Sequence, residues 1–208
     1  MGSDYSVVAL VQPGVTLASA LRSGGEPDEE ATRRLVEGSH PDCRIVGVYG
    51  SVLSESINTE AGSGVEAAVF PGLALLFSSR WDLDRPSELR PGEIGASLPP
   101  GYSTVAAGVV QNAGWAGVGV WDAEHRLVRS VSLAGGPTDH ELVEMVGSPL
   151  PEEEPWWFGS PEGHPQTLVQ AVLLSRIGFD FEHEGPGDPP VNLDEVPTLA
   201  FSIEPRDS

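Results

Sequence analysis

Residues 102–133, YSTVAAGVVQNAGWAGVGVWDAEHRLVRSVSL, carry the clearest strand pattern in the chain and decide the fold. Val105 to Val110 is a short apolar run, as in a buried strand. From Trp115 to Trp121, glycine and tryptophan alternate with alanine and valine, and the next four residues predict a hairpin turn. The return strand ends at Leu133 and has Arg129 at its middle, as a partner-contacting or edge residue. The strand glycines indicate the close approach of another backbone, or a bend.

Further strands are expected on both sides of this hairpin. They are short apolar runs bounded by glycine, proline or polar residues. Between Ala67 and Phe77, a Pro-Gly pair divides the run into two pieces joined by a turn or bulge. The other expected strands are Tyr5–Val11, Arg44–Tyr49 (as a second buried strand), Phe179–His183 and Thr198–Ile203.

Four segments are predicted to be helical. The first is Val15–Arg22. The second begins near Pro27, with acids in its first turn, and ends at Gly38 as the residue after the helix. Asp139–Val146 follows a plausible cap and predicts a short helix. Pro165–Ile177 is the strongest, and its apolar residues cover most of its circumference, so we expect it deep in the fold. The prolines in Trp81–Leu98 leave room for short helical turns only.

These elements predict an α+β fold for residues 1–208 as a single domain. We expect a mostly antiparallel or mixed sheet, one deeply packed helix, and several short helices on one side. The segment Pro149–Pro165 holds five prolines and no periodicity, so it is expected to be a long loop.

The charge balance limits the classes of partner. The chain of 208 residues has 31 acidic and 11 basic side chains, all of the latter arginine, for a net charge of −20. Nucleic acids and anionic membranes are therefore disfavoured, because both are bound through clustered Lys and Arg. A basic protein partner is favoured. The alternative is that the acidity only keeps the protein soluble.

The cysteine content and the N-terminal segment favour the cytoplasm. Cys43 is the single cysteine, so it cannot form an internal disulfide or a cysteine metal cluster. The N-terminus shows no secretory signal, and no apolar run is long enough to span a bilayer.

The sequence contains no recognisable catalytic motif, and we predict no catalytic residue, metal site or cofactor. A phosphate-binding loop and a G-x-S-x-G elbow are both absent. In a helix, His140 and Glu144 would lie on one face with a spacing that suits two metal ligands, but such pairs are common by chance. His40 lies beside turn residues and is expected to be a capping or solvated histidine.

An acidic–aromatic segment is the predicted protein-binding site. It combines acids for steering with aromatic anchors, as interfaces with basic partners do. The alternative is that the aromatic residues pin an irregular loop to the core. The predicted binding residues are Glu152, Glu153, Glu154, Trp156, Trp157 and Phe158.

Several short motifs together resemble an uncharacterised family of actinobacterial proteins, over nearly the whole chain. The resemblance implies a cytoplasmic bacterial protein of one domain and brings no activity. The motifs are Asp84–Ser87, Trp121–Leu133, Val146–Pro151, Glu154–Trp157, Phe70–Gly72, the His164-Pro165 helix ending at Gly178-Phe179, and Glu195–Leu199.

We therefore expect a non-catalytic protein-binding domain, for example an immunity or accessory protein that masks a basic partner surface. The alternative is an enzyme or small-ligand-binding protein whose site is built from scattered residues, with His140 and Glu144, or the Trp156-Trp157 loop, at its mouth. A nucleic-acid mimic is disfavoured because the acids show no regular spacing. The sequence does not define the oligomeric state.

Overall fold

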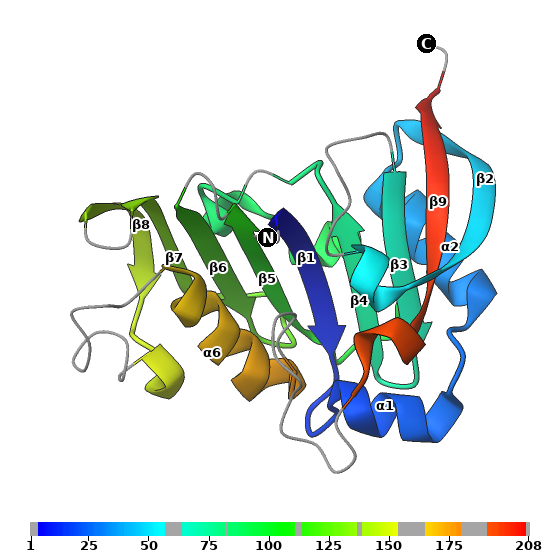
Figure 1. The fold of residues 1–208 in the computed structure, drawn as a ribbon, viewed down its shortest axis with the longest axis horizontal. Helices are drawn as coiled ribbons and strands as arrows, with labels where there is room; N and C mark the ends of the chain where they lie inside the picture. The colour runs from blue at the N-terminus through cyan, green and yellow to red at the C-terminus, as the bar shows by residue number, and fades with distance from the viewer. Residues whose placement is uncertain are drawn as a thin grey trace.

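A single antiparallel sheet organises the part of the chain that the computed structural model describes, residues 4–56, 64–81, 83–110, 114–136, 139–153, 165–179 and 191–206. Its order is β2-β9-β3-β4-β1-β5-β6-β7-β8, and every pairing is antiparallel (Figure 1). The strands are β1 (Asp4–Val11), β2 (Cys43–Val52), β3 (Gly64–Phe70), β4 (Leu73–Ser78), β5 (Ser103–Val110), β6 (Trp115–Trp121), β7 (Leu127–Gly136), β8 (Asp139–Gly147) and β9 (Pro197–Pro205).

Helices cover both faces of the sheet (Figure 1). Apolar residues of α1, α3 and α6 pack against one face, which we call the α6 face. Residues of α2 and α4 pack against the other, the α2 face. The prediction that the smaller helices share one side is therefore wrong. The helices are α1 (Leu17–Gly24), α2 (Glu29–Ser39), α3 (Leu53–Ser56), α4 (Pro91–Ile94) and α6 (Pro165–Ile177), with 3-10 turns η1 (Pro86–Glu88), η3 (Pro151–Glu153) and η4 (Leu193–Glu195).

Strand β1 lies in the middle of the sheet and is apolar on both faces. Val7 and Ala9 belong to the core on the α6 face, whereas Val8 and Leu10 belong to the core on the α2 face. A strand covered on both sides needs no polar face, which explains why this segment is a continuous apolar run rather than an alternating one.

Local caps explain where the first two helices begin. The Thr16 hydroxyl accepts a hydrogen bond from the Ser19 N–H, and the Ser19 hydroxyl accepts one from the Thr16 N–H, which forms a capping box before α1. The Asp28 carboxylate caps α2 by accepting from the Ala31 N–H at 2.8 Å. Helix α2 continues to Ser39, so Gly38 lies inside it and not after its end.

The glycines of β6 have a structural role on the α2 face. A Cβ atom at Gly117 would overlap the carbonyl oxygen of Leu83, and one at Gly119 would meet the Trp121 ring and Pro86. The chain before η1 therefore crosses β6 at a distance that only glycine allows. This confirms the expected close approach of another backbone.

The hairpins β3–β4 and β6–β7 and strand β9 are confirmed, as are the short turns between Trp81 and Leu98. The helix expected over Asp139–Val146 is wrong, because these residues form β8, which pairs with β7. Segment Arg44–Tyr49 lies in a strand, but β2 is at the sheet edge and Tyr49 is 61% exposed, so this strand is not buried.

Helix α6 exists as predicted, but it is not enclosed. Leu168, Val172 and Ile177 are buried against the sheet, whereas Thr167 and Ser175 are exposed. The helix therefore lies on one face of the sheet and keeps an exposed outer side. Of the expected strand Phe179–His183, only Phe179 lies among the described residues, where it is buried, and most of the expected loop Pro149–Pro165 lies outside them.

Candidate functional site

Only the beginning of the predicted acidic–aromatic site lies among the described residues. Glu152 and Glu153 are in η3, whereas Glu154, Trp156, Trp157 and Phe158 lie outside the described part of the chain.

Glu153 forms a fully buried ion pair with Arg129 of β7. The Arg129 Nε and Nη2 atoms donate to the two Glu153 carboxylate oxygens at 2.8 and 2.7 Å. The Arg129 Nη1 atom donates to the Gly147 carbonyl oxygen at 2.8 Å, and the Leu150 N–H donates to Glu153 Oε1 at 3.1 Å. Neither side chain reaches the surface. The expectation that Glu153 presents its charge to a partner is therefore wrong, and so is the expectation that Arg129 is an edge or partner residue.

Glu152 also forms an ion pair within the chain. Its Oε1 atom accepts from the Arg176 Nε atom of α6 at 2.8 Å, and the Glu152 side chain is 12% exposed. Glu152 and Glu153 together tie η3 to α6 and to β7. Both carboxylates thus have an internal cation, and we assign them a structural role in positioning the chain that follows β8.

The paired His140 and Glu144 are not a helical chelate. Both residues lie on β8, where positions four apart are about 13 Å apart along the strand. No group of His, Cys, Asp or Glu side chains within the described residues is arranged to hold a metal ion.

Glu144 instead joins β8 to η1. Its carboxylate accepts from the Ser87 N–H at 3.1 Å, from the Ser87 hydroxyl at 2.6 Å, and from the Ser130 hydroxyl. Burial acts to raise the pKa of Glu144, but the hydrogen bonds from Ser130 and Ser87 outweigh it, so that this pKa lies below its ordinary value. Glu144 is therefore a carboxylate at neutral pH.

Strand β8 exposes apolar side chains at the end of the sheet. It pairs with β7 on one side and is the last strand in the sheet order. Leu142 is 48% exposed and Met145 is 45% exposed, and Val143 and Val146 are exposed to a similar degree. Of the features that protect edge strands, β8 has no proline or lysine but has a bulge and the acids Glu141 and Glu144. Together with β2, this strand holds most of the exposed large apolar residues of the described chain.

The two faces of β8 differ in character. Cross-strand partners share a face. Leu142 pairs with Leu133 and Met145 pairs with Val131, and both partners belong to the core on the α6 face. Glu144 pairs with Ser132, whose hydroxyl bonds the Asp84 carbonyl oxygen on the opposite face.

Glu141 completes this second face. It pairs with Ala134, two positions from Ser132 on β7, and is exposed. The edge is therefore apolar on the α6 face, whereas the α2 face carries Glu141, Glu144 and the exposed Val146, which pairs with Ser130. We call this part of the strand the β8 edge (residues Glu141–Gly147).

The arginines of the chain do not form a positive patch. Counting only acids in the described part of the chain, nine of the eleven make ion pairs, and the guanidinium of Arg206 bonds the Cys43 carbonyl oxygen. The surplus acids have no internal cation to balance them. The net charge of −20 is thus available to an external partner.

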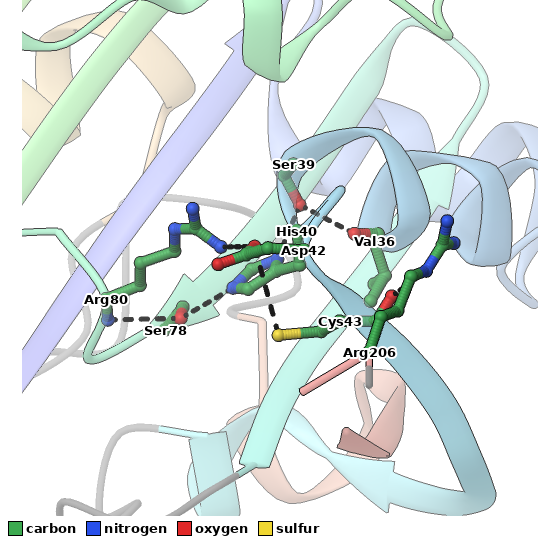
Figure 2. Close-up of polar contacts among 8 residues, drawn as sticks. All are labelled: Val36, Ser39, His40, Asp42, Cys43, Ser78, Arg80 and Arg206. Atoms are coloured by element: carbon green, nitrogen blue, oxygen red, sulfur yellow. Dashed lines mark hydrogen bonds and ion pairs between the residues drawn. The ribbon is translucent and has the colours of Figure 1, made fainter. Parts of the chain in front are cut away.

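A second polar cluster surrounds His40 at the end of α2. The Ser39 hydroxyl donates to the Val36 carbonyl oxygen at 3.0 Å and lies 2.8 Å from His40 Nδ1. The other ring nitrogen, Nε2, lies 3.1 Å from the Ser78 hydroxyl oxygen at the end of β4 (Figure 2). This network fits the tautomer in which Nδ1 carries the proton and Ser78 donates to Nε2.

The surroundings of His40 favour the neutral ring. Burial lowers its pKa most and the nearby charge of Arg80 lowers it further, whereas the backbone of Val36 and the charge of Asp42 oppose them only in part. Arg80 forms an ion pair with Asp42 beside the ring (Figure 2). His40 also caps α2 through its N–H, which confirms the capping expectation, but it is 2% exposed and so is not solvated. Sequence reasoning missed the contact with Ser78, because 38 residues separate the two positions.

The chemistry of this cluster is limited. A serine hydroxyl hydrogen-bonded to a neutral imidazole is the contact that activates a nucleophile. Here the ring is oriented by a hydroxyl and not a carboxylate, and Ser78 is 8% exposed and also accepts from the Arg80 N–H. The cluster joins α2 to β4 with every partner satisfied.

The fold and these clusters define an α+β protein. Helices cover both faces of its antiparallel sheet, and its last strand, β8, exposes both apolar and acidic side chains. The chain belongs to a family of unknown function, DUF6928, which it matches over residues 6–201. This confirms the resemblance to an uncharacterised family. No curated protein and no solved structure matches the chain. Among the described residues, no helix has the length and apolar character needed to cross a membrane.

Proposed function

We propose that this chain is a non-catalytic protein-binding domain that binds a basic protein at its β8 edge, for example as an immunity or accessory protein that masks a basic surface. The observation that carries the proposal is an open strand with exposed Leu142 and Met145 and the acids Glu141 and Glu144, on a chain of net charge −20. Exposed apolar residues beside charges are the composition of an interface.

The charge supports the choice of partner. A surface with this excess of carboxylates attracts cationic proteins and repels nucleic acids and anionic membranes. The proposal places the protein in the cytoplasm of an actinobacterium. Support for this setting comes from the single cysteine, Cys43, which needs no oxidising compartment, and from the motifs that resemble actinobacterial proteins.

Charge reversal at the edge tests this function. Glu141→Arg and Glu37→Arg change the net charge equally, and both positions are exposed, but Glu37 is on α2, far from the β8 edge in Figure 1. The immobilised wild type is expected to retain a discrete basic protein from a host lysate at low salt and to release it at high salt. Glu141→Arg should lose this protein and Glu37→Arg should keep it.

Retention of no basic protein by the wild type at low salt would contradict the proposed function. Equal loss in both variants would show that only net charge matters. Substitution of Glu153 is unsuitable for this test, because its carboxylate neutralises the buried Arg129.

An enzyme with an acyl-transfer site at Ser78 is the second candidate, favoured by the Ser78–His40 contact. A fluorophosphonate probe tests it, because such probes form a bond with activated serine oxygens. Labelling that disappears in Ser78→Ala and persists in Ser103→Ala would support the enzyme, and absence of labelling would remove this candidate.

A further inference from the structure

We infer that the partner binds as an added β-strand, in which an extended segment with alternating basic and apolar residues pairs with the backbone of β8. This inference rests on the proposed function and adds to it the mode of binding and the pattern of the partner sequence.

The backbone of β8 supports strand addition. Within the described residues, β8 has β7 as its strand partner and nothing paired on its other side. Figure 1 shows it as the last strand of the sheet, at the end opposite β2. An edge strand presents a row of unpaired N–H and C=O groups, which is the template that extended peptides use when they extend a sheet.

Strand β7 shows which pattern a neighbour of β8 must have. A register shift between Ser132 and Leu133 leaves Val143 as an extra residue in β8. Despite it, β7 alternates regularly, with serines on the α2 face and Val131 and Leu133 on the α6 face. A strand added on the other side of β8 would lie beside the same bulge. Its side chains would point alternately to the α2 face and the α6 face, so its sequence pattern has a period of two.

The side chains of β8 define the chemistry of each face. On the α6 face, the incoming residues lie beside Leu142 and Met145, which are about half exposed and favour apolar partners. On the α2 face, they lie beside Glu141 and Glu144, which favour Arg or Lys, and beside Val146 at the end of the strand. Glu144 is held as a carboxylate by the Ser87 and Ser130 hydroxyls, so its charge is present before the partner arrives.

The same charges disfavour a second copy of this chain as the occupant. Two copies would bring together surfaces of net charge −20, and each would place its own Glu141 and Glu144 at the shared edge. A cationic segment removes this repulsion. Charge complementarity thus selects a basic partner strand over self-association.

Synthetic peptides test the inference. The probe is a capped peptide of about eight residues, a usual strand length, in which arginine and valine alternate. Its control has the same composition, with all arginines before all valines. We expect the wild-type protein to bind the alternating peptide at least about tenfold more tightly than the control at low salt. Two further peptides carry N-methyl groups, one at the odd-numbered residues and one at the even-numbered residues. At least one of them should bind about tenfold or more weakly than the unmethylated peptide, because N-methylation removes backbone hydrogen bonds between strands.

Matched variants locate the binding site. The double variant Leu142→Asp, Met145→Asp should weaken binding of the alternating peptide by about tenfold or more. The double variant Val46→Asp, Tyr49→Asp makes the same change at the opposite sheet edge, where the two side chains are 50% and 61% exposed, and should leave binding unchanged. If the first variant fails to fold, the N-methylated peptides still decide the question on the wild-type protein.

The outcomes separate the two proposals. Equal affinity for both peptides, or no effect of N-methylation, overturns strand addition while leaving a basic-partner function intact. Binding of neither peptide, with no basic protein retained from the lysate, overturns both. A wild-type dimer that Leu142→Asp, Met145→Asp dissociates would show that the occupant is a second copy, and would also overturn the inference.

Discussion

Two residues of this protein, Glu153 and His40, have environments that their neighbours in the sequence do not indicate. Glu153 stands in a run of three acids, which is typical of a solvated surface, yet it is buried against Arg129. His40 follows a helix end and borders a turn, yet it is enclosed between two hydroxyls. Both facts depend on residues distant in sequence, so local pattern alone cannot supply them.

Removing Glu153 should strongly destabilise the fold. In Glu153→Leu, the Arg129 guanidinium stays buried without its counter-charge, and we expect the free energy of unfolding to fall by about 3–5 kcal/mol. Urea denaturation followed by circular dichroism measures this change. Glu152→Gln is the control, because its partner Arg176 is partly exposed, and about 1 kcal/mol or less is expected. Similar losses in the two variants would contradict the assigned role of the buried pair.

His40 should make the fold sensitive to mild acid. Burial lowers its pKa in the folded state below the ordinary value of 6.5, so the unfolded chain takes up a proton first as the pH falls. The free energy of unfolding should therefore decrease below about pH 6.5, as the pH falls towards the folded pKa.

Substitution isolates this contribution. The stability of His40→Gln should depend less on pH across that window than the stability of the wild type. His125→Asn, which removes an exposed histidine, should keep the wild-type slope. If His40→Gln loses as much unfolding free energy in acid as the wild type does, His40 is not the source of the pH dependence.

At the scale of elements, local pairings are readable from sequence and distant ones are not. The β6–β7 hairpin is predictable because its strands and its turn are contiguous, and Pro71-Gly72 likewise marks the β3–β4 hairpin. Segment Asp139–Gly147 mixes Leu, Glu and Met, which favour helices, with valines, which favour strands. Pairing with β7 decides between them, and this pairing is a tertiary contact. The insertion of β9 between β2 and β3 has no local signal either.

Element packing predicts which glycine is essential. Gly117→Ala should lower the free energy of unfolding by about 1–3 kcal/mol, because the new methyl group would meet the Leu83 carbonyl oxygen. Gly50→Ala is the matched control in β2, where a Cβ atom meets nothing within 4 Å, and its effect should be about 0.5 kcal/mol or less. Thermal or urea unfolding compares the two. Equal effects would contradict the close crossing of the chain over β6.

For the whole molecule, the dominant property is its uncompensated charge. The arginines are mostly engaged in internal ion pairs, and 20 negative charges remain. The candidate site likewise belongs to this scale. The sheet order makes β8 the last strand, and the register places Leu142 and Met145 on one face and Glu141 and Glu144 on the other. The charge of the sequence led us to predict a basic protein partner, but the sequence cannot indicate which strand ends the sheet.

Self-repulsion should make stability depend on salt. Raising the ionic strength from about 0.01 M to about 0.15 M shortens the screening length from about 30 Å to about 8 Å and weakens repulsion between surface carboxylates. The melting temperature should therefore increase with NaCl over this range. A melting temperature that falls instead would show that the surface ion pairs outweigh the repulsion.

Hydrogen exchange of the backbone amides is the most direct test of the β8 edge. The wild-type chain, with and without the alternating arginine–valine peptide, is followed amide by amide. We expect slower exchange at alternate amides of Glu141–Gly147 when the peptide is bound, and no change in β2 at the opposite end of the sheet. Bound peptide with unchanged exchange in β8, or with protection confined to another part of the chain, would contradict it.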